Sequence, residues 1–304
     1  MKKPVITVLG SINMDLVTVS ELMPHQGETL LGQSFSTFPG GKGANQAVAA
    51  TRLGAEVIML GKVGSDLFGT KIRDLLKKES VNVDYVDTAT QLETGTATIL
   101  VSKQDNRIIV VPGANNEVTP EWVMAHEQQI KNSELLLLQL EIPLESIEKA
   151  IEIANNHGIP VVLNPAPFQI LPSKLLKGLT YLTPNEHEFK QLLNHASKED
   201  LELIKAKSIV TKGEKGVEFQ VNNQQTIIDA KKVEVIDTTG AGDTFNGALA
   251  VALTKRLSLS DAVYFATVAA SISITKMGAQ TGMPNISELE EKLDFYQSIK
   301  ISVE

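Results

Sequence analysis

The residues best suited to chemistry lie in one short stretch, residues 237–247, which read DTTGAGDTFNG. Gly240, Ala241 and Gly242 carry almost no side chain. At a helix start they would leave the first-turn N–H groups open to an anion, which the positive end of the helix dipole also attracts. Asp243 would repel that anion, but it makes sense as the base that takes a proton from an attacking nucleophile. The stretch therefore suggests phosphoryl transfer with Asp243 as base.

The surroundings of this stretch predict how it is built. A strand-like segment around Val233 and Val235 precedes it, and helix-compatible residues continue to Lys255. The pattern predicts a strand, a turn and a helix that Thr238 or Thr239 would cap. An Asp in a first helical turn also complements the dipole without any catalytic role, so this stretch alone leaves both interpretations open.

Length and composition limit the class of protein. The 304 residues suffice for one large α/β domain or two small ones. A net charge of −8 argues against a nucleic-acid or anionic-membrane partner. The absence of cysteine excludes disulfides, thiolate nucleophiles and cysteine-based metal sites. We expect a cytoplasmic protein, because the apolar runs at residues 5–9 and 263–274 are too short for a signal peptide or a membrane span.

Strand-like and helix-like segments alternate along most of the chain, and we read residues 1–304 as one α/β domain. Strands are expected at residues 5–9, 57–60, 135–138, 160–163, 179–182 and 208–211, with a hairpin at 217–221 and 225–228. Helices are expected at residues 66–79, 144–157, 185–193, 240–255, 260–275 and 286–295, besides an alanine-rich helix that Gly54 closes. This alternation predicts a mostly parallel, doubly wound sheet.

Four further β-prone segments interrupt that pattern. They lie at residues 16–20 and 29–38, and at 95–101 and 107–111, where a polar turn at 103–106 joins the second pair. They predict a small sheet set apart from the main one, spanning about 16–38 and 95–111. Such a half-exposed sheet usually needs cover from a ligand, a closing lid or a partner subunit.

Several amide and carboxylate side chains follow predicted strands or begin a helix. In open α/β sheets the carboxyl ends of the strands form the ligand site. Any one of these residues could be an ordinary turn or loop residue, but together they are typical of a pocket for adjacent hydroxyl groups. The set is Asn13, Asp15, Asn45 and Glu141. Gly41 and Lys42 stand with Asn45 at the start of the alanine-rich helix, where hydroxyls or anions would be held.

Two further segments have a structural and a functional interpretation. Asn185 and Glu188 fit a helix-capping box, or they could act through water on a divalent cation and phosphates. Thr211 and Gly213 belong either to a nucleotide-contacting loop or to an ordinary glycine turn. The chain has no Walker A motif, no G-x-G-x-x-G and no H-E-x-x-H, so P-loop, dinucleotide and zinc-protease chemistry have little support.

Two long motifs resemble the signatures of the ribokinase family of carbohydrate kinases (the PfkB family). They are GGKGANQA, from Gly40 and continuing to Gly64, and DTTGAGDTF at residues 237–245. GSINMD at 10–15, QLE at 139–141 and PNE at 184–186 add to the resemblance, which covers essentially the whole chain. It implies a three-layer α/β/α sandwich with a mostly parallel central sheet and a small β-sheet lid.

The resemblance also implies a reaction: ATP-dependent phosphorylation of D-ribose at O5 to D-ribose 5-phosphate, with Mg²⁺. Asp243 would be the general base, and the N–H groups of Gly240, Ala241, Gly242 and Asp243 the anion hole. Ribose would contact Asn13, Asp15, Gly41, Lys42, Asn45, Ala97, Glu141, Asp243 and an apolar residue near Ile109. The nucleotide would contact Asn185, Thr211, Gly213 and Gly242, and Glu188 would serve Mg²⁺ through water.

A monovalent cation, usually K⁺, and a homodimer paired through the lid are implied as well. The cation ligands would be Asp237 and the carbonyls of Thr239, Ser273, Lys276 and Gly278. Family members often have Ala or Arg where this chain has Ser273 and Lys276, a difference that backbone ligation tolerates. Two alternatives remain open: a kinase for another sugar or nucleoside (deoxyribose, fructose, adenosine or pseudouridine), and a non-catalytic sugar or nucleotide sensor.

Overall fold

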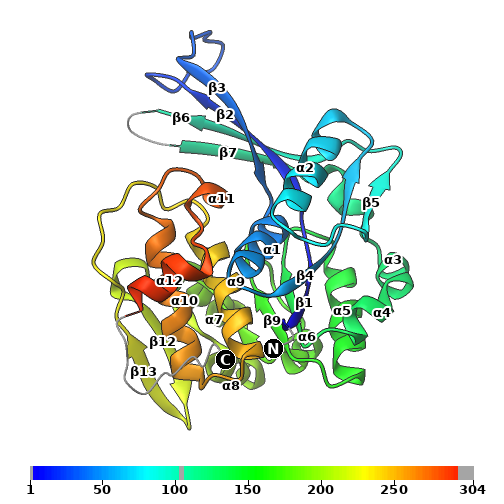
Figure 1. Ribbon diagram of the computed structural model, residues 1–304, viewed down its shortest axis with the longest axis vertical. Helices are drawn as coiled ribbons and strands as arrows, with labels where there is room; N and C mark the ends of the chain where they lie inside the picture. Colours follow the sequence, from blue (N-terminus) through cyan, green and yellow to red (C-terminus); the bar gives the residue numbers. More distant parts are fainter. Residues whose placement is uncertain (1–2, 103–105, 294–304) are drawn as a thin grey trace.

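A parallel sheet forms the centre of the molecule (Figure 1). The computed structural model describes residues 3–102 and 106–293. The six strands lie in the order β10-β9-β8-β1-β4-β5, and every pairing between them is parallel. Their bounds are β1 Val5–Leu9, β4 Glu56–Gly64, β5 Val86–Ala89, β8 Leu135–Gln139, β9 Val161–Asn164 and β10 Tyr181–Leu182.

A three-stranded antiparallel sheet continues this one beyond β10. Its strands are β11 Val210–Thr211, β12 Val217–Val221 and β13 Gln224–Ile228. Two isolated parallel bridges, Leu182 with Ser208 and Asn185 with Thr211, link the two sheets. The hairpin expected at 217–228 is confirmed.

Helices cover both faces of the sheet, because alternate strand residues point to opposite sides. Leu135 and Leu137 pack with α1, α2, α9, α10 and α12, whereas Leu136 and Leu138 pack with α3 to α8. The first layer is α1 Lys42–Arg52, α2 Leu67–Lys78, α9 Ala241–Thr254, α10 Leu259–Ser273 and α12 Ile286–Lys292. The second is α3 Pro120–Ala125, α4 Glu127–Lys131, α5 Leu144–Asn156, α6 Ser173–Gly178, α7 Glu186–His195 and α8 Lys198–Lys207. The predicted three-layer sandwich is confirmed.

Several elements differ from the sequence-based expectation. Strand β5 and helices α3, α4, α6 and α8 were not expected. The segment around Val233 and Val235 is not a strand but irregular, exposed chain, because none of the strands in the described ranges lies beside it to complete a ladder. The predicted end of the last helix, at residue 295, lies outside the described residues. Within the described ranges, no helix combines the length and apolar character needed to cross a bilayer.

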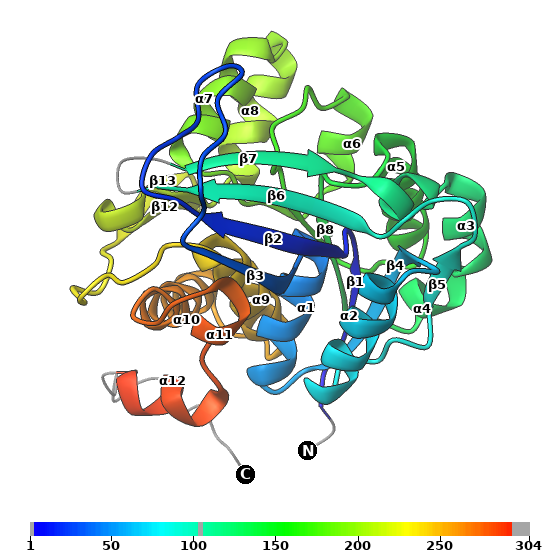
Figure 2. The same ribbon diagram turned by 90° about the horizontal axis from the view of Figure 1, so that it is seen from above.

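The four interrupting strands form the expected separate sheet, in the order β3-β2-β6-β7. Its strands are β2 Asn13–Val19, β3 Ser34–Gly40, β6 Gly95–Val101 and β7 Asn106–Val111. The short helices not yet named are η1 Gly113–Glu117, η2 Gly213–Lys215 and α11 Ala279–Gly282. Figures 1 and 2 show this small sheet across one end of the molecule. The expected strand at 29–38 begins only at Ser34, and the expected turn at 103–105 lies outside the described residues.

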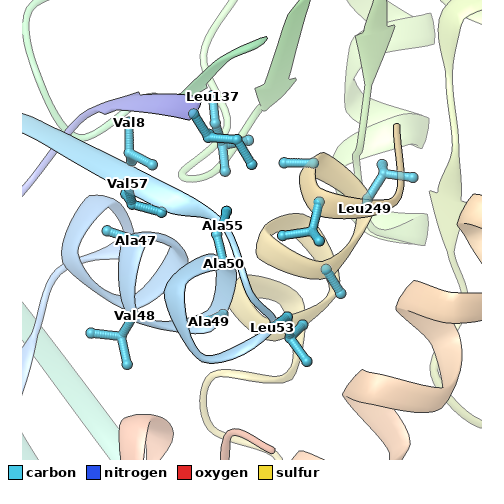
Figure 3. Packing of buried hydrophobic residues seen from close by; sticks show 14 of the residues in the cluster. Val8, Ala47, Val48, Ala49, Ala50, Leu53, Ala55, Val57, Leu137 and Leu249 are labelled. Atoms are coloured by element: carbon cyan, nitrogen blue, oxygen red, sulfur yellow. The ribbon is translucent and has the colours of Figure 1, made fainter. Parts of the chain in front are cut away.

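Close packing of α1 against α9 brings distant parts of the sequence together. Figure 3 shows alanines of α1 and Leu249 of α9 in one cluster with side chains of the sheet. Gly247 makes this approach possible: a Cβ added there would lie 2.6 Å from the Cβ of Ala49 and 2.8 Å from the carbonyl oxygen of Gln46. The packing of these helices determines what faces Asp243, four residues before Gly247.

We expect Gly247→Ala to lower the free energy of unfolding by about 1–3 kcal/mol, because the new methyl group overpacks the α1–α9 contact. Helix propensity alone would favour alanine by roughly 1 kcal/mol, so the direction of the change is diagnostic. Gly242→Ala in the same helix is the control, since a Cβ there meets nothing within 4 Å. Urea denaturation measures both variants, and a Gly247→Ala variant at least as stable as the unmodified chain would contradict the expectation.

Candidate active site

The turn before α9 is closed by glycine and not by a threonine cap. Gly240 is the N-cap residue at φ 78° and makes no side-chain cap, in a region that glycine adopts without strain. The expectation that Thr238 or Thr239 caps the helix is therefore wrong. Thr239 instead donates its N–H and its hydroxyl to Asp237 Oδ1, at 2.9 and 2.7 Å, which fixes the loop before the helix.

The N-terminus of α9 is open on the side where an anion is expected. The N–H of Ala241 donates to the carbonyl of Thr238 at 3.2 Å, so this predicted donor is partly used within the turn. Gly242 is exposed, and a Cβ there would meet nothing within 4 Å. The N–H groups of Gly242 and Asp243 belong to the first turn, whose N–H groups lack intrahelical partners, so they are the better anion donors.

Asp243 lies buried behind that opening, with 8% of its surface exposed. Asn45 Nδ2 donates to Oδ2 at 2.9 Å, and Gln46 Nε2 donates to Oδ1 at 3.1 Å. Burial raises the pKa of Asp243, while Lys42 and these two amides lower it in part. Gln46 was not predicted, although a glutamine in a buried, alanine-rich helix was a signal that could have indicated it.

The predicted hydroxyl-binding residues gather around the start of α1. Glu141 Oε2 accepts hydrogen bonds from Ser11 Oγ at 2.5 Å and from the N–H of Lys42 at 3.2 Å. Asn13 Oδ1 accepts one from Asn115 Nδ2 at 2.7 Å. Ser11 and Asn115 hold these groups in place and were not predicted, because no local motif marks a buried partner so far away in sequence.

Gly41 allows this tight arrangement. It has φ 87°, and a Cβ there would lie 2.7 Å from the backbone nitrogen of Asn13 and 2.8 Å from the carbonyl oxygen of Ser11. The start of α1 can therefore approach the chain between β1 and β2 closely only with glycine at this position.

Carboxylates outnumber cations in this cluster. Burial, together with Glu141 and Asp243, raises the pKa of Asp15 to about 7, and Lys42 acts in the opposite direction. Burial by itself would lower the pKa of Lys42, but the carboxylates of Asp243, Glu141, Glu188 and Asp15 outweigh it and raise that pKa. One ammonium thus serves four carboxyl groups, an arrangement suited to an uncharged ligand that donates several hydrogen bonds.

The small sheet adds an apolar side to the cluster. Asp15 pairs with Ala97, and Ala97 pairs with Val110. Directly paired residues share a face of a sheet, so these three form one row, in which Ala97 is buried. Ile109 lies on the opposite face, and its neighbours Ile108 and Val110 are the apolar residues of β7 on the face of Ala97.

A separate cavity is bordered by three of the residues that were predicted to bind the nucleotide. Asn185, Thr211 and Gly213 border a cavity of about 590 Å³, together with Glu186, His187, Lys190 and Lys212. Asn185 Oδ1 accepts from the N–H of Glu188 at 2.8 Å, and Glu188 Oε2 accepts from the N–H of Asn185 at 2.9 Å. The capping box is therefore present. Burial raises the pKa of Glu188, although the Asn185 N–H and Lys42 oppose the shift.

The residues predicted to hold a monovalent cation lie in the loop before α9 and in the chain from the end of α10 to Gly278. The side chain of Asp237 connects these two segments. Asp237 Oδ2 accepts from the N–H of Gly278 at 2.8 Å. Burial tends to raise the pKa of Asp237, but its bonds from Thr239 and Gly278 outweigh this effect and lower the pKa. The carboxylate is thus held ionised between the two segments.

The carbonyls of Ser273, at the end of α10, and of Lys276, in the loop after it, converge near Gly282. A Cβ added at Gly282 would lie 2.4 Å from the carbonyl oxygen of Ser273 and 3.6 Å from that of Lys276. The Ser273 hydroxyl donates to Ala270 and the Lys276 ammonium to Glu288, so both side chains are engaged elsewhere. Carbonyls beside an ionised carboxylate fit a monovalent cation in kind, and no three acidic or histidine side chains gather as metal ligands in the described part of the chain.

Comparisons with known proteins identify the family of this chain. Residues 3–286 match the model of the pfkB family of carbohydrate kinases. The chain is 47% identical to the ribokinase of Bacillus subtilis over 289 residues, covering 95% of this chain and 99% of the relative. The structure of Arabidopsis thaliana ribokinase complexed with ribose and ATP superposes with a TM-score of 0.88 at 31% identity, covering 97% and 100%. That of Thermotoga maritima ribokinase gives 0.85 at 36%, covering 95% and 98%. The chain belongs to the pfkB family of carbohydrate kinases.

Proposed function

We propose that this protein is a ribokinase, which transfers the γ-phosphoryl group of ATP to O5 of D-ribose. The observation that carries the proposal is the position of Asp243: a buried carboxylate at the open N-terminus of α9, held by amides of α1 among hydroxyl-binding groups. Two solved relatives are ribokinases, and one was described with ribose and ATP bound. The products are D-ribose 5-phosphate and ADP.

Asp243 acts as the general base. Its carboxylate takes the proton of the 5-hydroxyl while that oxygen attacks the γ-phosphorus and the bond to the β,γ-bridging oxygen breaks, releasing ADP. A pKa raised by burial makes this carboxylate a stronger base than a solvent-exposed Asp. The first-turn N–H groups of Gly242 and Asp243 meet the charge that develops on the transferred group.

Ribose is bound by the groups around the start of α1. Asn13, Asp15, Asn45 and Glu141 would accept or donate hydrogen bonds to its hydroxyls, with Gly41 and Lys42 beside them, and Ala97 with Val110 would cover its apolar face. An excess of carboxylates over cations favours a neutral polyol over an anionic sugar phosphate. The small sheet then serves as a lid that excludes water, whose attack would hydrolyse ATP.

ATP is bound along the cavity at Asn185, Thr211 and Gly213, with its terminal phosphate directed to Gly242. Mg²⁺ bound with the phosphates would neutralise their charge, and Glu188 could reach it through water. A K⁺ ion held by Asp237 and the carbonyls of Thr239, Ser273, Lys276 and Gly278 would add positive potential beside the anion hole.

The lid also offers a surface for a second copy of the chain. Large apolar side chains on its strands are exposed, namely Phe35, Phe38, Ile108, Ile109, Val110 and Val111. β7 is an edge strand in which every residue is exposed, and an apolar edge of this kind is normally covered. We infer a homodimer that pairs through the lid sheets.

Turnover with a panel of acceptors tests the reaction. ADP release from Mg-ATP should be fastest with ribose, slower with deoxyribose, fructose, adenosine or pseudouridine, and slower when K⁺ is omitted. Asp243→Asn should lower kcat by at least ~100-fold, because a general base of this kind contributes on that scale, while ATP still binds. A faster alternative acceptor would reassign the substrate, and the absence of ADP with every acceptor would favour a sensor. Near-normal turnover of Asp243→Asn would remove its role as base.

Asp15→Asn should raise the free energy of unfolding and weaken the binding of ribose. The folded-state pKa of Asp15 is raised to about 7 from 3.8, so its ionisation destabilises the fold increasingly as pH rises from 3.8 to 7. The variant should therefore unfold with about 1–4 kcal/mol more free energy than the unmodified chain at pH 8, and with a smaller gain at pH 5. Its KM for ribose should rise. Asp74→Asn, on the exposed side of α2, controls for the loss of one charge, and a gain independent of pH would refute this account.

Ile109→Glu should produce a monomer in sedimentation velocity experiments with unchanged unfolding behaviour, since Ile109 is 66% exposed in the single chain and a buried charge would disrupt the interface. Ile227→Glu is the matched control, because Ile227 is similarly exposed (58%) on β13, outside the lid. The unmodified chain and the control should sediment as dimers. A dimeric Ile109→Glu variant would rule out the lid as the interface.

A further inference from the structure

A chain of buried amides leads from the central sheet to Asp243. Gln139, the last residue of β8, donates through Nε2 to Gln46 Oε1 at 2.7 Å. Gln46 in turn donates through Nε2 to Asp243 Oδ1 at 3.1 Å. Both glutamines are fully buried, with 0% of their surface exposed. Neither side chain can therefore touch a substrate, and the chain of bonds ends at the proposed base.

The direction of these hydrogen bonds is set by groups that can only accept. Asn164 Nδ2 donates to the backbone carbonyl of Thr183 at 3.0 Å, which leaves Asn164 Oδ1 facing Gln46 Nε2 at 3.3 Å. A carbonyl accepts and never donates, and so does an ionised carboxylate. The amide nitrogen of Gln46 is thus held between two acceptors, Asn164 Oδ1 and Asp243 Oδ1, and its oxygen must face Gln139.

Gln139 is fixed as well. Its Oε1 lies where a side chain at position 10 would be: a Cβ added at Gly10 would be 1.9 Å from that oxygen. The amide oxygen fills the space beside Gly10 and has no hydrogen-bond partner among the described residues, whereas the amide nitrogen donates to Gln46. A fixed donor of this kind can hold a carboxylate in one orientation without adding charge to the site.

Asp243 needs such a donor because the charges around it oppose one another. Lys42 on α1 attracts its negative charge, whereas Glu141 after β8 and Asp15 on β2 repel it. Asn45 holds only Oδ2. A second bond, from Gln46 to Oδ1, restrains the carboxylate plane from turning about its Cβ–Cγ bond.

We propose that Gln46 is the positioning residue of the base: held as a donor by Asn164 and Gln139, it fixes the orientation of the Asp243 carboxylate. The inference rests on the proposed function, in which Asp243 takes the proton of the acceptor hydroxyl. Gln46 acts through Asp243 alone. Its loss changes proton transfer and leaves the binding of ribose and ATP in place.

The test is Gln46→Met, which keeps the length of the side chain and removes the donor. We expect kcat to fall by about 10-fold or more, on the scale of a lost hydrogen bond to a charged group, with KM for ribose changed by less than about 3-fold. The acidic limb of the kcat–pH profile should move to higher pH by on the order of one unit, because the ionised form of Asp243 has lost a donor. Gln139→Met should change both quantities in the same direction but less, since Gln46 would keep two of its three bonds.

Ser133→Ala is the control for a lost buried hydrogen bond. Ser133 is 4% exposed and bonds to Thr7 and Gln129 next to the first residues of β8, at the opposite end of that strand from Gln139. It should lower stability and leave the pH profile unchanged. An acidic limb that stays in place in Gln46→Met, or one that moves equally in Ser133→Ala, would overturn the proposal. If Gln46→Met does not fold, an acidic limb that stays in place in Gln139→Met would overturn the proposal instead. The unmodified chain distinguishes failure of the proposed function from failure of this inference. If the unmodified chain releases no ADP with ribose, the proposed function fails. If it releases ADP normally but the acidic limb of Gln46→Met does not move, only the role of Gln46 is removed.

Discussion

A buried carboxylate is tolerated only where donors or a cation replace the water it has lost, and the site of this protein is built on that constraint. Asp243 receives two amide bonds and the field of one ammonium, all from residues 42–46 of α1. Helices from opposite ends of the sequence must therefore pack almost backbone to backbone. Gly247 and the alanines of α1 provide that approach, so the chemistry depends directly on the packing of two helices.

The use of amides, and not further cations, has an electrostatic reason. Each additional lysine would attract phosphate oxygens into the region where hydroxyl groups must bind. Amide donors orient Asp243 without changing the net charge, which stays negative around Asp15 and Glu141. In the proposed reaction, the N–H groups at the start of α9 would receive the phosphate. The amides and carboxylates around the start of α1 would receive the sugar.

Local sequence predicted the reactive turn, the central sheet and the residues at the start of α1, because each has a short-range signature. It failed where a distant partner decides the outcome. Within the described residues, Val233 and Val235 have strand propensity but no neighbouring strand to pair with. The threonine cap failed for a local reason, because Thr239 bonds to Asp237 two residues before it and Gly240 takes the cap position. Gln46 and Asn115 owe their roles to residues about 100 to 200 positions away, and helices as short as α6 carry too few turns to show a period.

The small sheet begins almost where the central sheet ends, since only residues 10–12 separate β1 from β2. Asn13 and Asp15 therefore lie close to the point where the small sheet joins the central sheet. Val19 lies about 20 Å farther along β2, at the rise of an extended strand. A small rotation of the small sheet about this junction would move the far end of β2 over a long distance. It would displace the side chains of Asn13 and Asp15 only slightly. In the proposed reaction, such a movement would let a sugar enter and leave while Asn13 and Asp15 keep their positions.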